Sequence, residues 1–264
     1  MKTLTVAACL ALASHAAQAQ SLESRIANAK GHVEFQFTTR RNVCGNGMSI
    51  TISDDSTAGW LTRTSRSGIH IGRTMAGDNA RCEEGPGRVV ITHSGSKVTD
   101  VVVTVGGNAE RADTQLGAIS PGETARYLLA ITPALSGRSA ENAVMGAAIA
   151  DTTVNWKRML DIARDNSASE SARKATLFWV SQEAGSAATA GLSSVAMDDA
   201  AETSVRSDAL FFLAQRPRGE GVPGLIKVVK ESKSPKLRKD AIWHLSQSKD
   251  PRALDLFEQL LAGR

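Results

Sequence analysis

The chain lacks the short motifs that mark many enzymes. Its 264 residues contain no Cys-x-x-Cys pair, no Gly-x-Ser-x-Gly elbow, no P-loop and no dinucleotide-binding glycine fingerprint. The histidines are isolated, without the spacing or the neighbouring cysteines and carboxylates that would hold a metal. We therefore expect no metal and no cofactor, and we regard an enzymatic function as the less favoured class.

Charge of one sign and long apolar runs are also scarce. The chain has 31 lysines and arginines against 27 aspartates and glutamates, for a formal net charge of +4. These charges are interspersed, and no basic run marks a nucleic-acid site. No apolar run approaches the roughly 20 residues that a membrane-spanning helix needs. We expect neither a nucleic-acid partner nor a membrane-spanning segment.

The first nineteen residues have the pattern of a signal peptide. Lys2 gives a positive start, residues 4–13 are a short apolar run, and residues 17–19 place small side chains at the cleavage positions. We expect residues 1–19 to be removed and the mature protein to be periplasmic or secreted. A lipid anchor at Cys9 is a weaker alternative, because few apolar residues precede it.

Cysteine is rare, and export would leave only Cys44 and Cys82 in the mature chain. An oxidising compartment favours a disulfide between them over two free buried thiols. Chain entropy gives such a loop closure roughly 3–4 kcal/mol of stabilisation.

Residues 33–107 alternate in the manner of β-strands, after a polar lead-in at residues 20–32. The clearest element is a hairpin, in which residues 89–92 and 98–105 flank a Ser-Gly-Ser turn. Shorter strands are expected at residues 33–37, 48–52 and 69–71. The region is small for an independent core, so we expect a β module that the disulfide ties together.

Helical periodicity replaces this alternation in residues 118–264. Ser120 to Glu123 combine a capping hydroxyl, a proline at the first helical position and a glutamate at the third. Short loops between the helices imply antiparallel neighbours. We expect helices at residues 120–132, 139–150, 153–165, 169–184, 186–197, 203–216, 221–231, 235–248 and 251–262.

One helical motif occurs three times, at residues 172–182, 205–215 and 237–247. Its apolar positions recur at i, i+4 and i+8, which is the buried face of a helix. The closing residues Gln182 and Gln215 are 33 positions apart, and Gln247 follows 32 positions later. A period of this size predicts a stacked array of helical hairpins, in which each unit packs on its neighbours.

The three motifs resemble HEAT repeats, an α-solenoid family whose second helix carries Val-Arg-x-x-Ala. The arginines of the match are Arg173, Arg206 and Arg238, each followed three residues later by Thr or Ala. The resemblance covers roughly residues 140–262. It implies an α+β protein in which the small disulfide-tied β module precedes a HEAT-like α-solenoid of about four helical hairpins. The aromatic pairs in the motifs resemble a bacterial exported subgroup with an N-terminal β module.

The recurring arginines have two interpretations. Stacking would align Arg173, Arg206 and Arg238 in a ladder that binds an anion or an acidic partner. Alternatively, each arginine bonds backbone carbonyls or acids of the adjacent repeat, and we favour this structural interpretation. The glutamines Gln182, Gln215 and Gln247 would either bond a bound peptide or cap their helices, and capping is the favoured interpretation.

The motifs also hold five of the chain's eleven aromatic residues, and aromatics are only 4% of the chain. One ring of each pair should lie in the core. We expect the other, at Trp179, Phe212 and His244, to form an exposed ridge that offers an apolar groove to a partner helix.

Arrays of this kind usually bind other molecules, and HEAT arrays serve unrelated partners. The sequence therefore predicts an exported scaffold that binds a protein or peptide in the cell envelope. Two alternatives stay open. One is an envelope hydrolase with a site between the two domains, which would show a deep cleft of convergent ionisable groups. The other is a cell-wall or polysaccharide binder that stacks sugars on Trp60 and Trp179.

Overall fold

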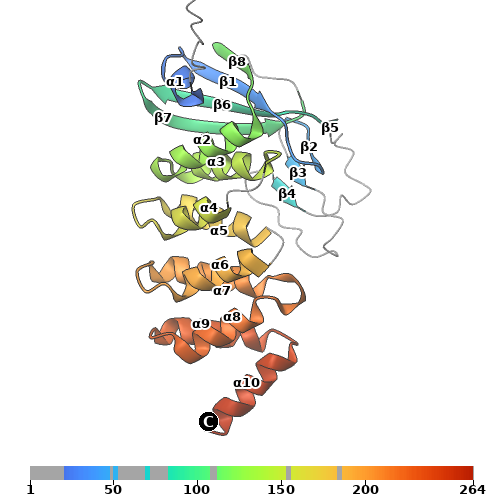
Figure 1. Cartoon of the computed structure of the whole chain (residues 1–264), viewed down its shortest axis with the longest axis vertical. Coiled ribbons are helices and arrows are strands. Elements are labelled where there is room, and N and C mark those ends of the chain that lie inside the picture. The colour runs from blue at the N-terminus through green and yellow to red at the C-terminus, as the bar shows by residue number, and fades with distance from the viewer. Residues whose placement is uncertain are drawn as a thin grey trace, which may run out of the picture.

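A computed structural model places a β region at one end of an elongated molecule and stacked helices below it (Figure 1). The α+β prediction is confirmed. The structure describes residues 21–47, 50–52, 69–71, 83–107, 112–152, 156–182 and 186–263. The predicted signal peptide, residues 1–19, and Trp60 lie outside these ranges.

The larger sheet has the strand order β7-β6-β1-β8. Its strands are β1 His32–Phe37, β6 Gly87–Ser94, β7 Lys97–Val105 and β8 Thr114–Ala118. β6 and β7 form the predicted hairpin, and Gly95 in its turn has a φ of 59°. β1 pairs antiparallel with β6 and parallel with β8. The sheet thus extends past residue 107, where the sequence pattern had placed the end of the β module.

The core face of this sheet packs on α3. Side chains of β1 alternate, and Val33, Phe35 and Phe37 are buried because every second residue points to one face. Helices α2 Pro121–Ile131 and α3 Gly137–Ile149 lie against that face (Figure 1). The Asn142 side chain on α3 donates a hydrogen bond to the carbonyl of Val101 at 2.9 Å, which joins helix and sheet.

A second, smaller sheet has the order β4-β3-β2-β5. Its strands are β2 Val43–Gly45, β3 Ile50–Ile52, β4 Ile69–Ile71 and β5 Glu83–Glu84. Cys44 lies in β2, opposite Glu84 of β5. Cys82 lies outside the described residues, so the Cys44–Cys82 disulfide stays a prediction.

The polar lead-in contains a short helix, α1 Leu22–Ala27, with Leu22 and Ile26 buried. The backbone N–H of Leu22 donates to Glu123 Oε1 at 2.9 Å, and Arg25 donates to the carbonyl of Leu116 at 2.8 Å. These bonds fasten α1 to the first turn of α2 and to β8.

The remaining helices form hairpins, and each predicted helix is present with ends shifted by a few residues. They are α4 Trp156–Arg164, α5 Glu170–Gln182, α6 Ser186–Met197, α7 Thr203–Ala214, α8 Val222–Glu231, α9 Pro235–Ser246 and α10 Pro251–Leu261. Two 3₁₀ turns, η1 Thr132–Ala134 and η2 Pro217–Gly219, follow α2 and α7. No helix in the described ranges is both long and apolar enough to cross a membrane.

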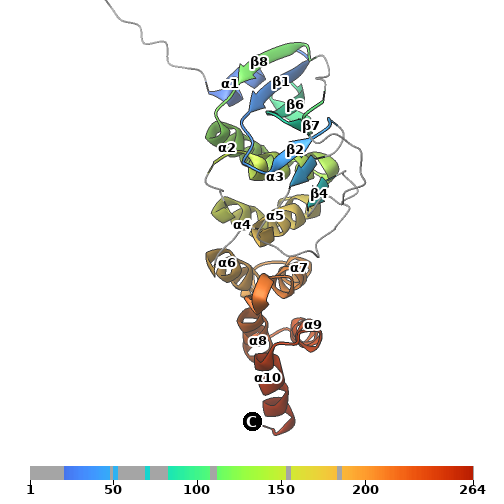
Figure 2. The same ribbon diagram turned by 90° about the vertical axis from the view of Figure 1, so that its right-hand side faces the viewer.

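The hairpins stack in one direction. The pairs α4/α5, α6/α7 and α8/α9 each pack within themselves and on the next pair, and Figure 2 shows first helices in one layer and second helices in the other. One apolar core runs from Leu22 in α1 to Leu256 in α10. The sheet and the hairpin stack therefore share a continuous interior.

Candidate binding face on the second helices

The second helices α5, α7 and α9 carry the three repeated motifs and lie side by side in one layer (Figure 2). We call their solvent side the second-helix face. It consists of three rows, each with one residue per helix. The rows are Lys174, Ser207 and Lys239; Phe178, Phe211 and Trp243; and Gln182, Gln215 and Gln247.

The motif arginines do not contribute to this face. Arg173 and Arg206 are each only 6% exposed. Arg173 bonds Glu202 Oε2 at 2.8 Å, while Arg206 donates to the carbonyl of Ala196 at 3.0 Å. Both contacts follow the structural interpretation, in which an arginine satisfies neighbouring carbonyls and acids.

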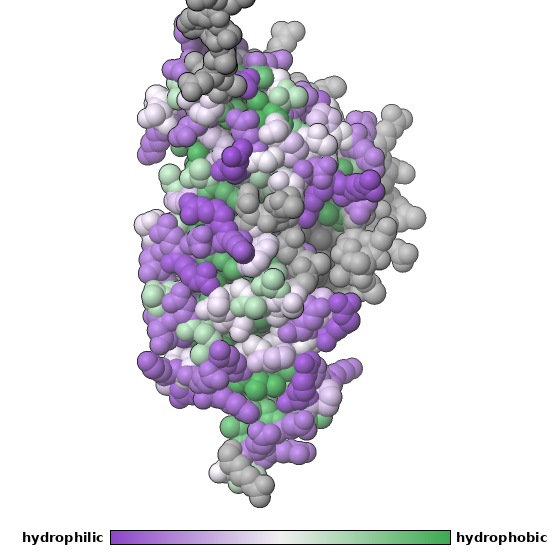
Figure 3. Space-filling model, viewed as in Figure 1, coloured by the Kyte–Doolittle hydropathy of each residue, from purple (hydrophilic) through white to green (hydrophobic). Residues whose placement is uncertain are grey.

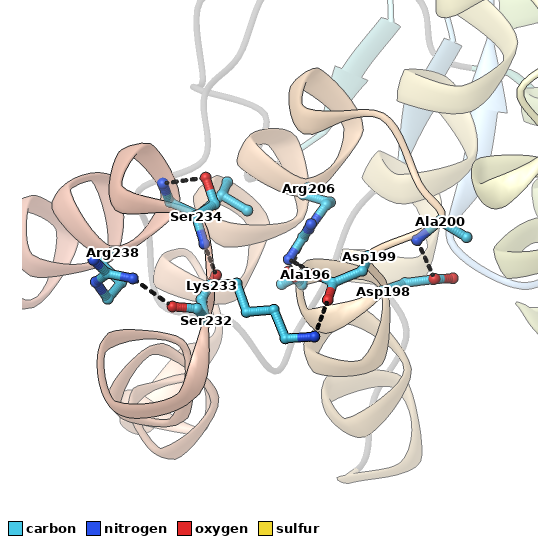
Figure 4. Close-up of polar contacts among 10 residues, drawn as sticks. Ala196, Asp198, Asp199, Ala200, Arg206, Ser232, Lys233, Ser234 and Arg238 are labelled. Atoms are coloured by element: carbon cyan, nitrogen blue, oxygen red, sulfur yellow. Dashed lines mark hydrogen bonds and ion pairs between the residues drawn. The ribbon is translucent and has the colours of Figure 1, made fainter.

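Figure 4 shows the same role for the other arginine. Arg238 donates to the carbonyl of Ser232 at 2.6 Å. Arg206 also lies 2.9 Å from Asp199 Oδ1, and Lys233 reaches Asp199 from the following hairpin at 3.7 Å. A ligand approaching these loops would meet the exposed carboxylate of Asp199 rather than a strip of guanidinium groups.

The predicted aromatic ridge is wrong, because the other ring of each pair is the more exposed one. Trp179 and Phe212 are 3% and 5% exposed, whereas Phe178 and Phe211 are half-buried and Trp243 is 60% exposed. The reason is the direction of each ring. Phe212 turns toward the preceding hairpin and meets Phe178 edge-to-face at 6.1 Å, so the joint between hairpins encloses it.

His244 occupies the same motif position as Phe212 and is half-buried. Its ring meets Phe211 of the preceding hairpin at 6.3 Å and Trp243 at 4.9 Å. Burial lowers the pKa of His244, and the nearby Asp240 carboxylate only partly offsets this effect. The exposed edge of the ring row is therefore Phe178, Phe211 and Trp243.

Burial of Trp179 also bears on the polysaccharide alternative. A sugar-stacking platform must present its indole face to solvent, and Trp179 does not. The other proposed platform, Trp60, lies outside the described residues.

The glutamines lie at the rim of the face. Gln182 and Gln215 are half-buried and Gln247 is exposed. The backbone N–H groups of Gln215 and Gln247 cap α7 and α9 by donating to carbonyls of the last turn. The amide of Gln247 donates to Ser246 Oγ at 3.2 Å, and that of Gln182 donates to Ser181 Oγ at 3.1 Å. The backbone makes these caps, so the helix ends do not depend on the side-chain amides.

Two carboxylates lie in the joints between the second helices. Burial raises the pKa of Asp208, and the nearby Lys174 only partly offsets it. Burial acts on Asp240 in the same direction, but hydrogen bonds from Lys236 and Ser207 outweigh it, so its pKa is lowered. Both groups are occupied by cations or hydroxyls of the array.

A cavity of about 470 Å³ lies on the other layer, between α6 and α8. Hydroxyls of Ser186, Thr189 and Ser193 line it, together with Glu220 and Lys227. Glu220 forms ion pairs with two arginines of the η2 turn region, at 3.0 and 2.9 Å, which outweigh burial and lower its pKa. A carboxylate held ionised in this way is poorly matched to proton transfer near neutral pH.

No group of three or more His, Cys, Asp or Glu that could hold a metal gathers within the described part of the chain. The geometry instead offers a broad surface with aromatic, cationic and amide rows. Sequence reasoning missed the joint contacts of Lys174 and Ser207. Aligning the three motifs would have found them. Asp208 and Asp240 each stand one motif later than Lys174 and Ser207, in the next column of the alignment.

Comparison with known families supports the repeat assignment for the C-terminal part. The profile of a family described as HEAT repeats matches residues 189–263, which span α7, α8, α9 and α10 and most of α6. No curated protein and no solved structure matches the chain. The match supports a HEAT-repeat domain over residues 189–263.

Proposed function

We propose that this protein is an exported HEAT-repeat scaffold that binds a protein or peptide partner on its second-helix face. The observation that carries the proposal is the ring row of Phe178, Phe211 and Trp243, which reaches the surface between a row with two lysines and a row of glutamines. HEAT repeats generally act as interaction scaffolds, and the match at residues 189–263 supports that role here.

The three rows match the chemistry of an extended peptide crossing the helices. Aromatic edges would take apolar side chains, glutamine amides would bond the peptide backbone, and Lys174 and Lys239 would attract acidic side chains. The rows run across the stack, so the partner would contact successive hairpins at equivalent positions. This arrangement favours a partner with a repeating or extended contact surface.

Export and the Cys44–Cys82 disulfide belong to the same proposal. The pattern of residues 1–19 supports cleavage near Gln20 and a periplasmic or secreted location. Intact-mass measurement of protein recovered from the producing cell tests both features. A chain that begins near Gln20 and lacks two thiol hydrogens is expected, and a full-length chain with two reactive thiols contradicts the proposal.

Affinity capture from the cell envelope tests the binding face. We expect Gln182→Glu with Gln215→Glu to lose the captured protein, because each change removes an amide donor and adds a charge without altering side-chain size. Lys157→Glu on the first-helix layer is the matched control, since Lys157 is also exposed and lies on α4. Retention of the protein by the glutamine variant, with circular dichroism unchanged, would place the partner elsewhere.

A further inference from the structure

The joint between α5 and α7 has a simple register. Two residues of α5, four positions apart, face two residues of α7, also four positions apart. Lys174 Nζ lies 3.6 Å from Asp208 Oδ1, and the ring of Phe178 meets Phe212 at 6.1 Å. Residues four apart lie on one side of a helix, so each helix contributes one stripe to the joint.

The joint between α7 and α9 repeats this register. Ser207 takes the place of the lysine and donates to Asp240 Oδ2 at 3.1 Å. Phe211 takes the place of Phe178 and meets His244 at 6.3 Å. In both joints, the later helix therefore supplies an aspartate and, four residues on, an aromatic ring.

The corresponding outward stripe of α9 consists of Lys239 and Trp243. Lys239 is exposed, and within the described residues no carboxylate forms an ion pair with it. The Trp243 ring is 60% exposed, in contrast to the half-buried Phe178 and Phe211 at the same motif position. On α5 and α7, the residues at these two motif positions contact the next second helix. On α9, the corresponding Lys239 and Trp243 side chains are exposed instead.

Helix α10 also has apolar side chains that no other described helix covers. It packs on α8, as α8 packs on α6, and it occupies the position of a first helix. Aligned on the prolines in the first turn of each helix, Leu254 and Phe257 of α10 correspond to Ile226 and Val229 of α8. Ile226 is half-buried and Val229 is buried, whereas Leu254 is 60% exposed and Phe257 is half-buried.

Leu254, Phe257 and Leu261 follow the i, i+3, i+7 spacing of one apolar stripe, and Leu261 is 89% exposed. Figure 3 shows hydrophobic side chains reaching the surface where α8, α9 and α10 lie. A stripe of this kind normally packs on another helix.

We propose that α9 and α10 form a docking site for one amphipathic helix of a partner protein, which packs on them as the second helices pack in the preceding hairpins. The partner helix carries an acidic residue for Lys239 and, four residues later, an aromatic ring for Trp243. Its remaining apolar side chains cover Leu254, Phe257 and Leu261. The site shares Lys239 and Trp243 with the second-helix face, and it adds the apolar stripe of α10, which the crossing peptide proposed for that face does not contact.

The chain itself supplies a probe with the required chemistry. A synthetic peptide of residues 203–216 contains Asp208 and Phe212, the pair that meets Lys174 and Phe178 within the array. A covalent staple between positions 207 and 211 holds it helical, because an isolated helix of this length is marginal in water. The staple occupies the stripe that faces away from the proposed contact.

Titration of the full-length protein with this peptide tests the proposal by calorimetry and by tryptophan emission. We expect saturable one-to-one binding and a blue shift from the newly covered Trp243. Lys239→Glu should weaken binding at least about tenfold, which is about 1.4 kcal/mol. A peptide with Asp208→Lys should restore the affinity of that variant and lose affinity for the wild type.

Lys97→Glu is the control variant, because Lys97 is exposed in the β6–β7 hairpin at the other end of the molecule. It should bind the peptide as the wild type does. Trp243→Ala and Leu254→Ser give a second measurement and should each abolish the signal in calorimetry. Both side chains are 60% exposed, so these variants should remain folded.

Three results would overturn the proposal. The first is no binding of the stapled peptide to the folded wild type. The second is binding that Lys239→Glu, Trp243→Ala and Leu254→Ser leave unchanged. The third is a dimer in sedimentation that these same variants dissociate, because a second copy would then occupy the site. Loss of the envelope partner in the Gln182/Gln215 variant, with peptide binding intact, separates this site from the second-helix face.

Discussion

The sheet region and the hairpin stack bury their side chains by different means. β1 is held between β6 and β8, so residues 32–37 are packed by chain segments about fifty and eighty positions away. In the stack, Phe212 is packed by the hairpin directly before its own. The sheet depends on distant pairings, while the stack depends on a short pattern that recurs between neighbours.

This difference predicts how far the loss of one contact spreads through the structure. A defect in β1 affects both of its neighbours and the helix layer of α3. A defect in one hairpin affects its own packing and one joint on either side. The four predictions below use this contrast, from the largest expected effect to the smallest.

The largest effect is expected from Phe35→Ala, which should cost about 3–5 kcal/mol of unfolding free energy. Phe35 is fully buried and meets Tyr127 of α2 edge-to-face at 6.4 Å. Leu245→Ala, at an equally buried position in α9, should cost about 2–5 kcal/mol. Amide hydrogen exchange should show protection lost across the sheet, α2 and α3 in the first variant, but only across α8, α9 and α10 in the second. Equal loss of protection in β1 for both would erase the contrast.

A comparison of two tryptophans tests the corrected phase of the aromatic row. Trp179→Ala should cost about 3–5 kcal/mol because the ring is enclosed in a joint. Trp243→Ala should change stability by only about 0.5 kcal/mol, because most of that ring is exposed. Urea unfolding followed by circular dichroism gives both values, with each tryptophan replaced by phenylalanine as a control. Similar costs at the two positions would mean that α9 is covered at its open stripe.

Arg206 and Lys233 share the carboxylate of Asp199 and differ in burial. Arg206→Met should cost about 1–3 kcal/mol, because it leaves the carbonyl of Ala196 without its donor. Lys233→Met should cost about 0.5 kcal/mol or less, because that lysine is 88% exposed at its side chain. Thermal unfolding of the two variants at equal salt makes the comparison, and a larger loss for Lys233→Met would contradict it.

The smallest effect concerns pH at the joint of α7 and α9. The pKa of His244 is below its usual 6.5 in the folded protein. The unfolded chain therefore binds the proton first, and stability present above about pH 6.5 is lost as pH falls toward the folded pKa. His244→Phe should remove this loss and match Phe212 at the equivalent position. Unfolding free energies at about pH 7.5 and about pH 5.5 give the measurement. If the unfolding free energy changes with pH by the same amount in the wild type and in the variant, His244 is not the source of the pH dependence.

The neighbouring carboxylates act at lower pH. The lowered pKa of Asp240 adds a loss of stability below its unfolded value of 3.8. Asp208 has a raised pKa and acts in the opposite direction, because its folded form binds the proton more readily. The interval just below pH 6.5 therefore isolates the contribution of His244 within this joint.

Sequence periodicity was sufficient for the helices and for the main hairpin. Helix starts such as Ser120 and Ser234 carry capping hydroxyls that accept backbone N–H bonds, and prolines follow them at the first position. The strand β8 had no comparable signal. Thr114–Ala118 buries little of its length, contains Gly117, and has Thr114 as its one strongly strand-forming residue. Its place in the sheet depends on the distant β1.

The candidate site was predicted in its residue types but not in its orientation. The 3.6-residue period shows that Phe178 and Trp179 lie near a buried face, but it does not show on which side the next hairpin packs. That direction decides which ring of each pair is enclosed. The contact between Phe178 and Phe212 shows on which side the next hairpin packs. The same register identifies Lys239 and Trp243 as the exposed stripe on α9.

The position of β1 also sets an order of events during synthesis. Among the described strands β1 emerges first, yet its antiparallel partner begins at Gly87 and its parallel partner at Thr114. An apolar strand must therefore wait unpaired while roughly fifty further residues are made, and unpaired strand edges promote aggregation. The hairpins need no such delay, since each closes on a segment made just before it. Chaperone dependence should accordingly belong to the first half of the chain, and the second half should fold as it emerges.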